Sequence, residues 1–199
     1  MDIYQITHFI NEGAKDLNIK KWDFGASFSN DFSVQIDRGT AKQLKASQKQ
    51  VLTLRVWNNK DLVGITTTSD LSESGLKKAL FQANLASEYG NQNEKTDFSP
   101  LAKEPIKPLI TKTNKPAGIK KLLEVLRMAE TNLLNKHEAI KSIPYNGLSE
   151  TFFKRFYANS DGASRSYQNS QAALYLYARA EEKEKKPRSS GAVEIGYSL

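Results

Sequence analysis

Apolar and polar residues follow two different periods along this 199-residue chain. In three stretches the apolar residues recur every three or four positions, which places them along one face of a helix. These stretches predict helices over residues 3–17, 72–89 and 117–136. Each predicted helix therefore has one apolar face to bury against another element of the fold.

Residues at the ends of the first two predicted helices support their limits. Asp2 and Ser72 stand just before a first turn, where a side-chain oxygen accepts a hydrogen bond from a backbone N–H. Gly90 follows the second helix and is predicted to end it in the left-handed conformation.

Outside the helices, apolar residues alternate with polar ones, which is the pattern of strands covered on one face. Turn-forming residues interrupt this alternation at 30–31, 37–39, 58–61 and 159–162. The predicted strands lie within 22–57, 63–68, 140–145, 150–158, 163–180 and 193–197.

The order of these elements predicts an α+β fold made of two antiparallel-sheet-plus-helix units. Residues 1–92 form the first unit (helix, β-meander, helix), and residues 117–199 form the second (helix, long strands). Residues 93–116 contain four of the six prolines and are predicted to be a stiff linker. The strand pattern from residue 193 onward reads as cut short, so we expect the second unit to be truncated.

The composition of the chain excludes several classes of functional site. The chain has no cysteine, which excludes disulfides, thiolate zinc sites and cysteine catalysis, and favours a cytoplasmic location. No apolar run approaches the roughly 18 residues that a membrane-spanning helix needs, so no membrane is expected as a partner. The net charge of +7 raises the question of nucleic acid. Because the basic residues are scattered, we favour a solvated surface over a nucleic-acid site.

The two histidines do not predict a metal site. His137 and Glu138 resemble the start of a zinc-protease motif, which needs a second imidazole one helical turn later. Lys141 and Ser142 occupy the positions where that imidazole would stand, and His8 is isolated in the first predicted helix. We therefore assign no catalytic residue and no metal ligand to this chain. The sequence also predicts that Ser69–Ser72 caps a helix and that Asn159–Gly162 makes a turn.

One strand carries the best candidate for a contact surface. Alternation over residues 163–180 places two arginines and three tyrosines on the same strand face, provided that no bulge intervenes. Aromatic and arginine side chains are typical anchors of protein interfaces, although a cross-strand aromatic ladder on a half-buried sheet explains the same pattern. The possible interface residues are Arg165, Tyr167, Tyr175, Tyr177 and Arg179.

Two longer segments, Val51–Gly90 and Phe156–Glu181, carry a family resemblance. The first contains Leu54–Val56 and Gly64–Ser72 followed by an alanine-rich helix, and the second contains the Asn159–Gly162 turn and the strand after it. With these features the chain resembles the TldD/PmbA family, historically called modulators of DNA gyrase. The run Thr68–Ser72 is more similar to the PmbA (TldE) branch than to the TldD branch.

This resemblance implies that the chain corresponds to the N-terminal half of a longer protein with a further β domain. It also implies a zinc metalloprotease that degrades unstructured peptides, in which a TldD-type subunit holds zinc on an HExxxH motif. The implied role is that of a non-catalytic part of a subunit. It dimerises with a TldD-like subunit, or with itself, and forms part of the wall of a chamber for peptides. Whether the full-length protein carries its own HExxxH motif stays open. The alternative, which the +7 charge and the family's older name suggest, is a DNA- or gyrase-associated binding module. The scattered basic residues make it the less favoured of the two.

Overall fold

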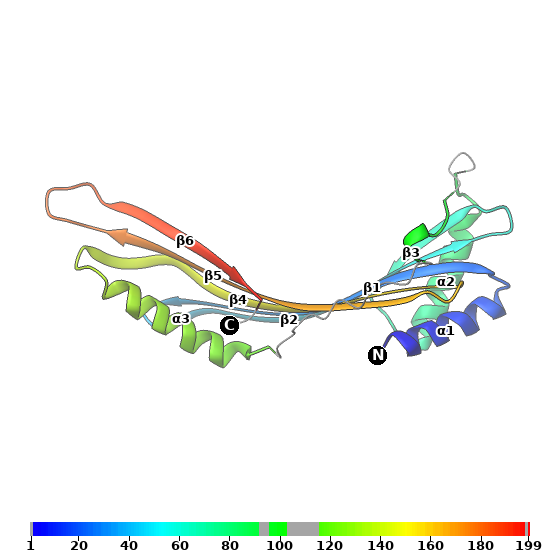
Figure 1. Ribbon diagram of the computed structural model, residues 1–199, viewed down its shortest axis with the longest axis horizontal. Coiled ribbons are helices and arrows are strands. Elements are labelled where there is room, and N and C mark those ends of the chain that lie inside the picture. The colour runs from blue at the N-terminus through cyan, green and yellow to red at the C-terminus, as the bar shows by residue number, and fades with distance from the viewer. Residues whose placement is uncertain (1, 92–95, 103–115, 198) are drawn as a thin grey trace. The chain divides into compact units, whose positions relative to one another are not determined.

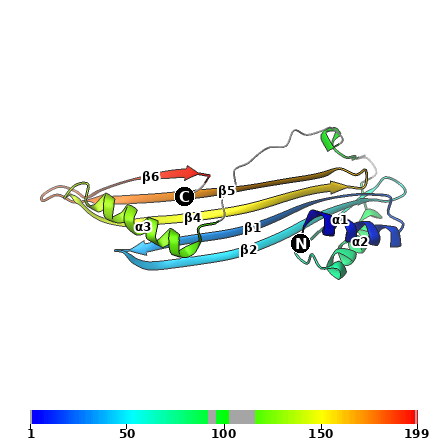
Figure 2. The same cartoon turned by 60° about the horizontal axis from the view of Figure 1, so that its bottom comes forward.

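The computed structural model describes residues 2–91, 96–102, 116–197 and 199, and it has the predicted α+β fold. The six strands of the described residues form one sheet in the order β3-β2-β1-β4-β5-β6 (Figure 1), and Figure 2 shows the part of this order from β6 to β2. The elements are α1 (Ile3–Asp16), β1 (Lys21–Asp37), β2 (Thr40–Trp57), β3 (Val63–Thr68), α2 (Glu73–Ser87), a 3₁₀ helix (Pro100–Ala102), α3 (Gly118–Leu134), β4 (Ile140–Asn159), β5 (Ser164–Ala180) and β6 (Arg188–Gly196). No helix among the described residues is both long enough and apolar enough to cross a bilayer.

The chain divides into two compact units that interleave along the sequence. Unit 1 consists of the described residues within 1–28, 49–110 and 154–167. Unit 2 consists of those within 29–48, 111–153 and 168–199. The sequence predicted two consecutive units, whereas here β1, β2, β4 and β5 each contribute to both, because these strands are 17 to 20 residues long. Most of the predicted linker at 93–116 lies outside the described residues.

In unit 1, α1 and α2 pack with the apolar face of the sheet. A capping box closes the start of α1, because Asp2 and Gln5 each accept a hydrogen bond from the other's backbone N–H. The predicted alternation is confirmed here, since every second residue of β1 and β2 enters the core. The fully buried residues include Ile6, Ile10, Phe24, Leu52, Leu54, Val56, Leu76 and Leu80.

In unit 2, α3 supplies the apolar cover for its part of the sheet. Leu122 and Leu126 lie one turn apart on α3 and are fully buried. They form a core cluster with Val34, Ile36 and Leu148. Leu174 and Leu176 of β5 are only partly buried and pack at the margin of this cluster.

Three of the four predicted turns are confirmed. Arg38 and Gly39 both have positive φ between β1 and β2, as a tight hairpin requires. Asp61 has a φ of 59° in the β2–β3 turn, and Gly162 has a φ of 87° in the β4–β5 turn.

The predicted turn at Asn30–Asp31 is wrong, because β1 runs through it without interruption. The Asp31 carboxylate accepts hydrogen bonds from the hydroxyls of Ser29 and Thr151, at 3.0 and 2.9 Å. These bonds satisfy the Asp31 carboxylate inside a strand. The side chain therefore does not have to bond to its own backbone in a turn.

The break predicted between 140–145 and 150–158 is also absent, since β4 is continuous. The buried amide of Asn146 accepts from Ile36 N and donates to Ile36 O, at 3.0 and 2.9 Å. A side chain thus takes the place of backbone groups in pairing with the neighbouring strand.

The role predicted for Gly90 is wrong as well. Gly90 does not have a positive φ, and the residue that caps α2, Glu88, is in the right-handed helical region. A Cβ atom at Gly90 would lie 2.9 Å from Leu62 Cβ and 3.0 Å from Val63 O. Glycine is required at this position because the chain passes close to the start of β3.

The backbones of β3 and α2 come even closer together at Gly64 in unit 1. A Cβ atom at Gly64 would lie 1.8 Å from the backbone oxygen of Ala83 on α2. Gly64→Ala must therefore separate β3 from α2, and we expect it to lower the free energy of unfolding by about 2 kcal/mol or more. Urea denaturation followed by circular dichroism measures this change.

Gly25→Ala is the matched control, because Gly25 is also a strand residue of unit 1 but has no atom within 4 Å of the position that a Cβ atom would take. We expect this substitution to leave the free energy of unfolding unchanged or to raise it by about 0.5 kcal/mol. Equal free energies for the two variants would contradict the close approach of β3 and α2.

Candidate functional site

The five predicted interface residues all lie on β5, but they fall in different compact units. Arg165 and Tyr167 belong to unit 1, where the guanidinium of Arg165 donates to the backbone oxygen of Ala102 at 3.2 Å. Tyr175, Tyr177 and Arg179 belong to unit 2. A single interface made of all five residues stays a prediction.

In unit 2, exposed apolar side chains gather on one face of the β5–β6 hairpin. Tyr175 pairs with Val193, and Ala173 pairs with Ile195. Directly paired residues of antiparallel strands project from the same face, so these four side chains share one surface. Val193 and Ile195 are 59% and 61% exposed, and Tyr177 is 44% exposed. We call Tyr175, Tyr177, Val193 and Ile195 the β5–β6 surface.

Two glycines make room for the tyrosine rings of this surface. A Cβ atom at Gly147 would lie 2.5 Å from the ring of Tyr175, and one at Gly191 would lie 2.5 Å from Tyr177 Cγ. Because nothing projects from Gly147, the Tyr175 side chain crosses β4 and accepts a 2.7 Å hydrogen bond from Gln35 on β1. This hydrogen bond holds the ring of Tyr175, while Tyr177 remains 44% exposed.

β6 is the last strand of the sheet, and it has a strand partner on one side only within the described residues. Its residues Arg188–Gly196 are almost all exposed. The end of the strand is tied to β5 by the Ser170 hydroxyl, which donates to the Tyr197 backbone oxygen at 2.7 Å. Such an edge presents backbone N–H and C=O groups that an added extended chain can pair with.

In unit 1, a buried charge cluster lies on strands that the sequence predicted only as core. Asp23 is 2% exposed and accepts two hydrogen bonds from the guanidinium of Arg55, one of them 2.8 Å long from Nε to Oδ1. Tyr157 donates to Asp23 Oδ2 at 3.2 Å. Burial raises the pKa of Tyr157, while the Asp23 carboxylate raises the pKa of Arg55.

Sequence reasoning missed this Asp23 cluster, although a signal exists. Asp23 stands between Trp22 and Phe24, and Arg55 stands between Leu54 and Val56, so two opposite charges interrupt two strongly apolar strands. Their pairing across neighbouring strands depends on sheet order, which the alternation pattern alone does not provide.

The remaining sequence candidates have structural roles. His137 Nδ1 accepts a 3.0 Å hydrogen bond from the backbone of Ala139 just before β4. Ser72 Oγ accepts from Gly75 N at 3.1 Å and caps α2, and Asn159 Oδ1 accepts from the backbone of Asp161 at 3.1 Å inside the turn. Among the described residues, no group of three or more His, Asp or Glu side chains is placed to hold a metal ion.

Part of the chain matches the model of a known protein family. Residues 112–199 match the family model described as the PmbA/TldA metallopeptidase central domain. The match begins before α3 and covers the β5–β6 surface. No curated protein matches the sequence at a significant level.

Solved structures share the fold of nearly the whole chain. A "putative modulator of a DNA gyrase" from Thermotoga maritima has a TM-score of 0.81 at 16% identity over 99% of this chain. TldE from Thermococcus kodakarensis has a TM-score of 0.77 at 17% identity over 96%, and a second "putative modulator of DNA gyrase", from Bacteroides thetaiotaomicron, has 0.69 at 13% over 98%. The chain spans 44%, 42% and 45% of the lengths of these proteins, respectively.

Because Asp23 and Arg55 are paired, we expect the stability of the fold to depend strongly on both charged side chains. Arg55→Met leaves the buried carboxylate of Asp23 without its guanidinium, and we expect a loss of about 2–3 kcal/mol of unfolding free energy. This value is below that of a fully buried pair because 34% of the Arg55 side chain is exposed to water. The double variant Asp23→Asn/Arg55→Met removes the orphaned charge and should recover at least half of the loss. Additive losses in the urea-denaturation cycle would contradict the pairing.

The raised pKa of Tyr157 predicts that the protein loses stability at alkaline pH. Because the folded pKa is raised above the unfolded value of about 10, the stability that Tyr157 contributes is present below pH 10. It is lost as the pH rises through the folded pKa, because the unfolded chain releases the phenolic proton first. Tyr157→Phe should therefore lose less unfolding free energy than the wild type between pH 9 and pH 11 (the approximate window that this sign implies). Parallel pH profiles from urea denaturation would show that Tyr157 titrates normally.

Proposed function

We propose that this chain is part of a PmbA/TldE-type subunit of a zinc metallopeptidase, because residues 112–199 match the family model of the PmbA/TldA metallopeptidase central domain. Its role is to pair with a TldD-type subunit and to form part of the wall of a chamber that takes unstructured peptides. The family-model match is the observation that carries this proposal. The likeness in fold to TldE from Thermococcus kodakarensis supports the choice of branch, as does the run Thr68–Ser72.

Zinc is assigned to the TldD-type partner in this proposal. The described residues of this chain offer no set of His, Asp and Glu side chains around one point, so they do not fit a zinc ion. In a metallopeptidase, zinc polarises the scissile carbonyl and activates water. In this proposal the residues of this chain bind and orient the peptide, and none of them takes part in the chemical step.

The β5–β6 hairpin supplies two kinds of contact for this role. Its exposed apolar face offers Tyr175, Tyr177, Val193 and Ile195 to another protein surface, which matches the composition of an interface core. The outer edge of β6 offers backbone hydrogen bonds to an extended peptide. Backbone pairing is indifferent to side chains, so it suits a subunit that must hold many different unfolded sequences.

The test uses the full-length protein, alone and mixed with its TldD-type partner. We expect zinc, measured by atomic emission, and hydrolysis of an unstructured peptide only in the mixture, with the metal on the partner. Zinc and hydrolysis by the full-length protein alone would overturn the non-catalytic assignment. The same samples in a DNA mobility-shift assay test the alternative, which predicts binding that weakens steeply with salt.

A variant in the full-length protein tests the β5–β6 surface itself. Val193→Lys/Ile195→Lys places two charges in the proposed interface, and we expect at least a tenfold weaker complex with the partner by isothermal titration calorimetry. Leu44→Lys is the matched control, because Leu44 is an exposed apolar strand residue of unit 2 that lies outside the β5–β6 surface. Equal affinities for both variants would remove this surface from the interface while leaving the family assignment intact.

A further inference from the structure

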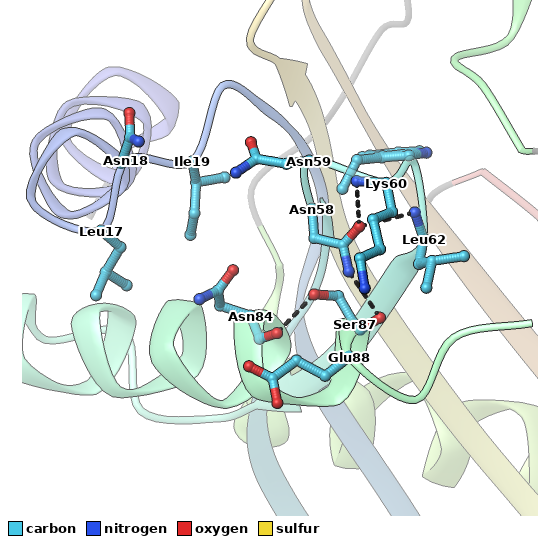
Figure 3. A pocket seen from close by; sticks show the side chains of 11 residues that line it. Leu17, Asn18, Ile19, Asn58, Asn59, Lys60, Leu62, Asn84, Ser87 and Glu88 are labelled. Carbon is cyan, nitrogen blue, oxygen red and sulfur yellow. Dashed lines mark hydrogen bonds between the residues drawn. The ribbon is translucent and has the colours of Figure 1, made fainter.

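A pocket of about 450 Å³ opens in unit 1, a volume in the range of ligand sites. Its walls come from three segments: the end of α1 with residues 17–19, the β2–β3 turn with residues 57–62, and the last turns of α2 with residues 84–88. Figure 3 shows these segments around the opening, with side chains from each of them.

Three of the apolar residues that line the pocket are buried. Ile19, Trp57 and Leu62 are all at least nine-tenths buried and belong to the interior of unit 1. The Trp57 indole donates to the backbone oxygen of Thr96 at 2.9 Å, which fixes the ring. The pocket is therefore formed by parts of the chain that are already packed, and a ligand does not have to order them.

Two polar residues in the wall serve the fold. Asn58 Oδ1 accepts from the backbone of Lys60 and Leu62, at 2.8 and 3.1 Å, and its amide nitrogen donates to Ser87 O at 3.0 Å. Ser87 Oγ donates to Asn84 O at 2.6 Å. These bonds join the β2–β3 turn to α2, and they hold the side chains of Asn58 and Ser87 in the fold.

Three further asparagines differ from Asn58 in this respect. The side-chain amides of Asn18, Asn59 and Asn84 line the pocket and have no hydrogen-bond partner within the described part of the chain. They come from three different segments, as Figure 3 shows. Asn18 is held in the left-handed conformation with a φ of 55°, which presents its side chain at the end of α1.

The charges at the pocket balance. Lys60 and Glu88 line it with opposite signs, and neither takes part in an ion pair among the described residues. A site with one positive and one negative group and three free amides does not select a charged ligand. Each primary amide instead offers a donor next to an acceptor, which is the complement of a peptide group.

We propose that this pocket binds the main-chain amides of an extended, uncharged peptide segment through Asn18, Asn59 and Asn84. The site lies in unit 1, whereas the β5–β6 surface lies in unit 2. Its binding needs neither zinc nor a partner subunit, so it can be tested with this 199-residue chain alone. Failure here would leave the proposed function standing, and failure of that function would leave this site standing.

The test is a ¹H–¹⁵N NMR titration with N-acetyl-triglycine-N-methylamide, which has main-chain amides and no side chains. We expect saturable shifts of the side-chain NH₂ signals of Asn59 and Asn84, with a dissociation constant on the order of 1 mM for so small a probe. Asn59→Ala/Asn84→Ala should weaken binding at least tenfold. The spectrum of each variant also reports whether it has folded.

Controls address the protein and the ligand separately. Gln82→Ala removes an exposed amide from the same helix at a position outside the pocket, and it should leave the affinity unchanged. The trisarcosine analogue keeps the carbonyl groups but lacks N–H donors along its chain, and it should bind at least fivefold more weakly. Absent shifts at Asn59 and Asn84 would overturn the proposal. Equal shifts with maltose would also overturn it, since the pocket would then recognise hydroxyl groups.

Discussion

The two-residue period of β1 and β2 is the constraint on which unit 1 depends. Trp22, Phe24 and Ala26 enter the core beneath α1 and α2, while Asp23 lies between them on the opposite side of the strand. The same alternation in β2 buries Leu54 and Val56 and turns Arg55 toward Asp23. A shift of one residue in either strand would turn the apolar residues away from the helices and place a charged residue against them, so the packing and the ion pair select the same register.

The close approach of α2 to β3 adds a second constraint on the same unit. Gly64 lets the helix backbone come near the strand, and Gly90 lets the following chain pass beside Leu62 and Val63. Asn58 then joins the β2–β3 turn to the end of α2 through its bond to Ser87. The contacts that hold α2 in place therefore also position two of the three segments that line the unit 1 pocket.

Local rules predicted those parts of the fold that local interactions determine. The helix limits followed from period and capping, because Asp2 and Ser72 act within three residues of their own positions. The turn predicted at Asn30–Asp31 failed because Thr151, 120 residues away, supplies a hydroxyl to Asp31. The left-handed Gly90 failed for a similar reason, since its neighbours come from another turn. Residue type alone does not show which distant group will satisfy a polar side chain.

The candidate sites show the same difference between local interactions, which the sequence pattern predicts, and contacts between distant residues, which it does not. Alternation correctly identified Tyr175 and Tyr177 as residues of one strand, but the glycines that accommodate their rings lie on β4 and β6. The Asp23 cluster and the asparagine pocket were not predicted, because each brings together side chains from three segments. Sheet order and helix placement create both, and neither is encoded in a short motif.

The two edges of the sheet differ in a way that bears on function. β3 is six residues long and carries three consecutive threonines, so Ile65 is its single large exposed apolar side chain. β6 is longer and exposes Val193 and Ile195 beside the rings of β5, while Glu194 between them projects from the opposite face. Exposed apolar edges promote uncontrolled pairing, and proteins usually shorten, charge or cover them. β6 is not short, and this face of it carries no charge beside Val193 and Ile195. Covering is the remaining means of protection, which is what a partner subunit at the β5–β6 surface would provide.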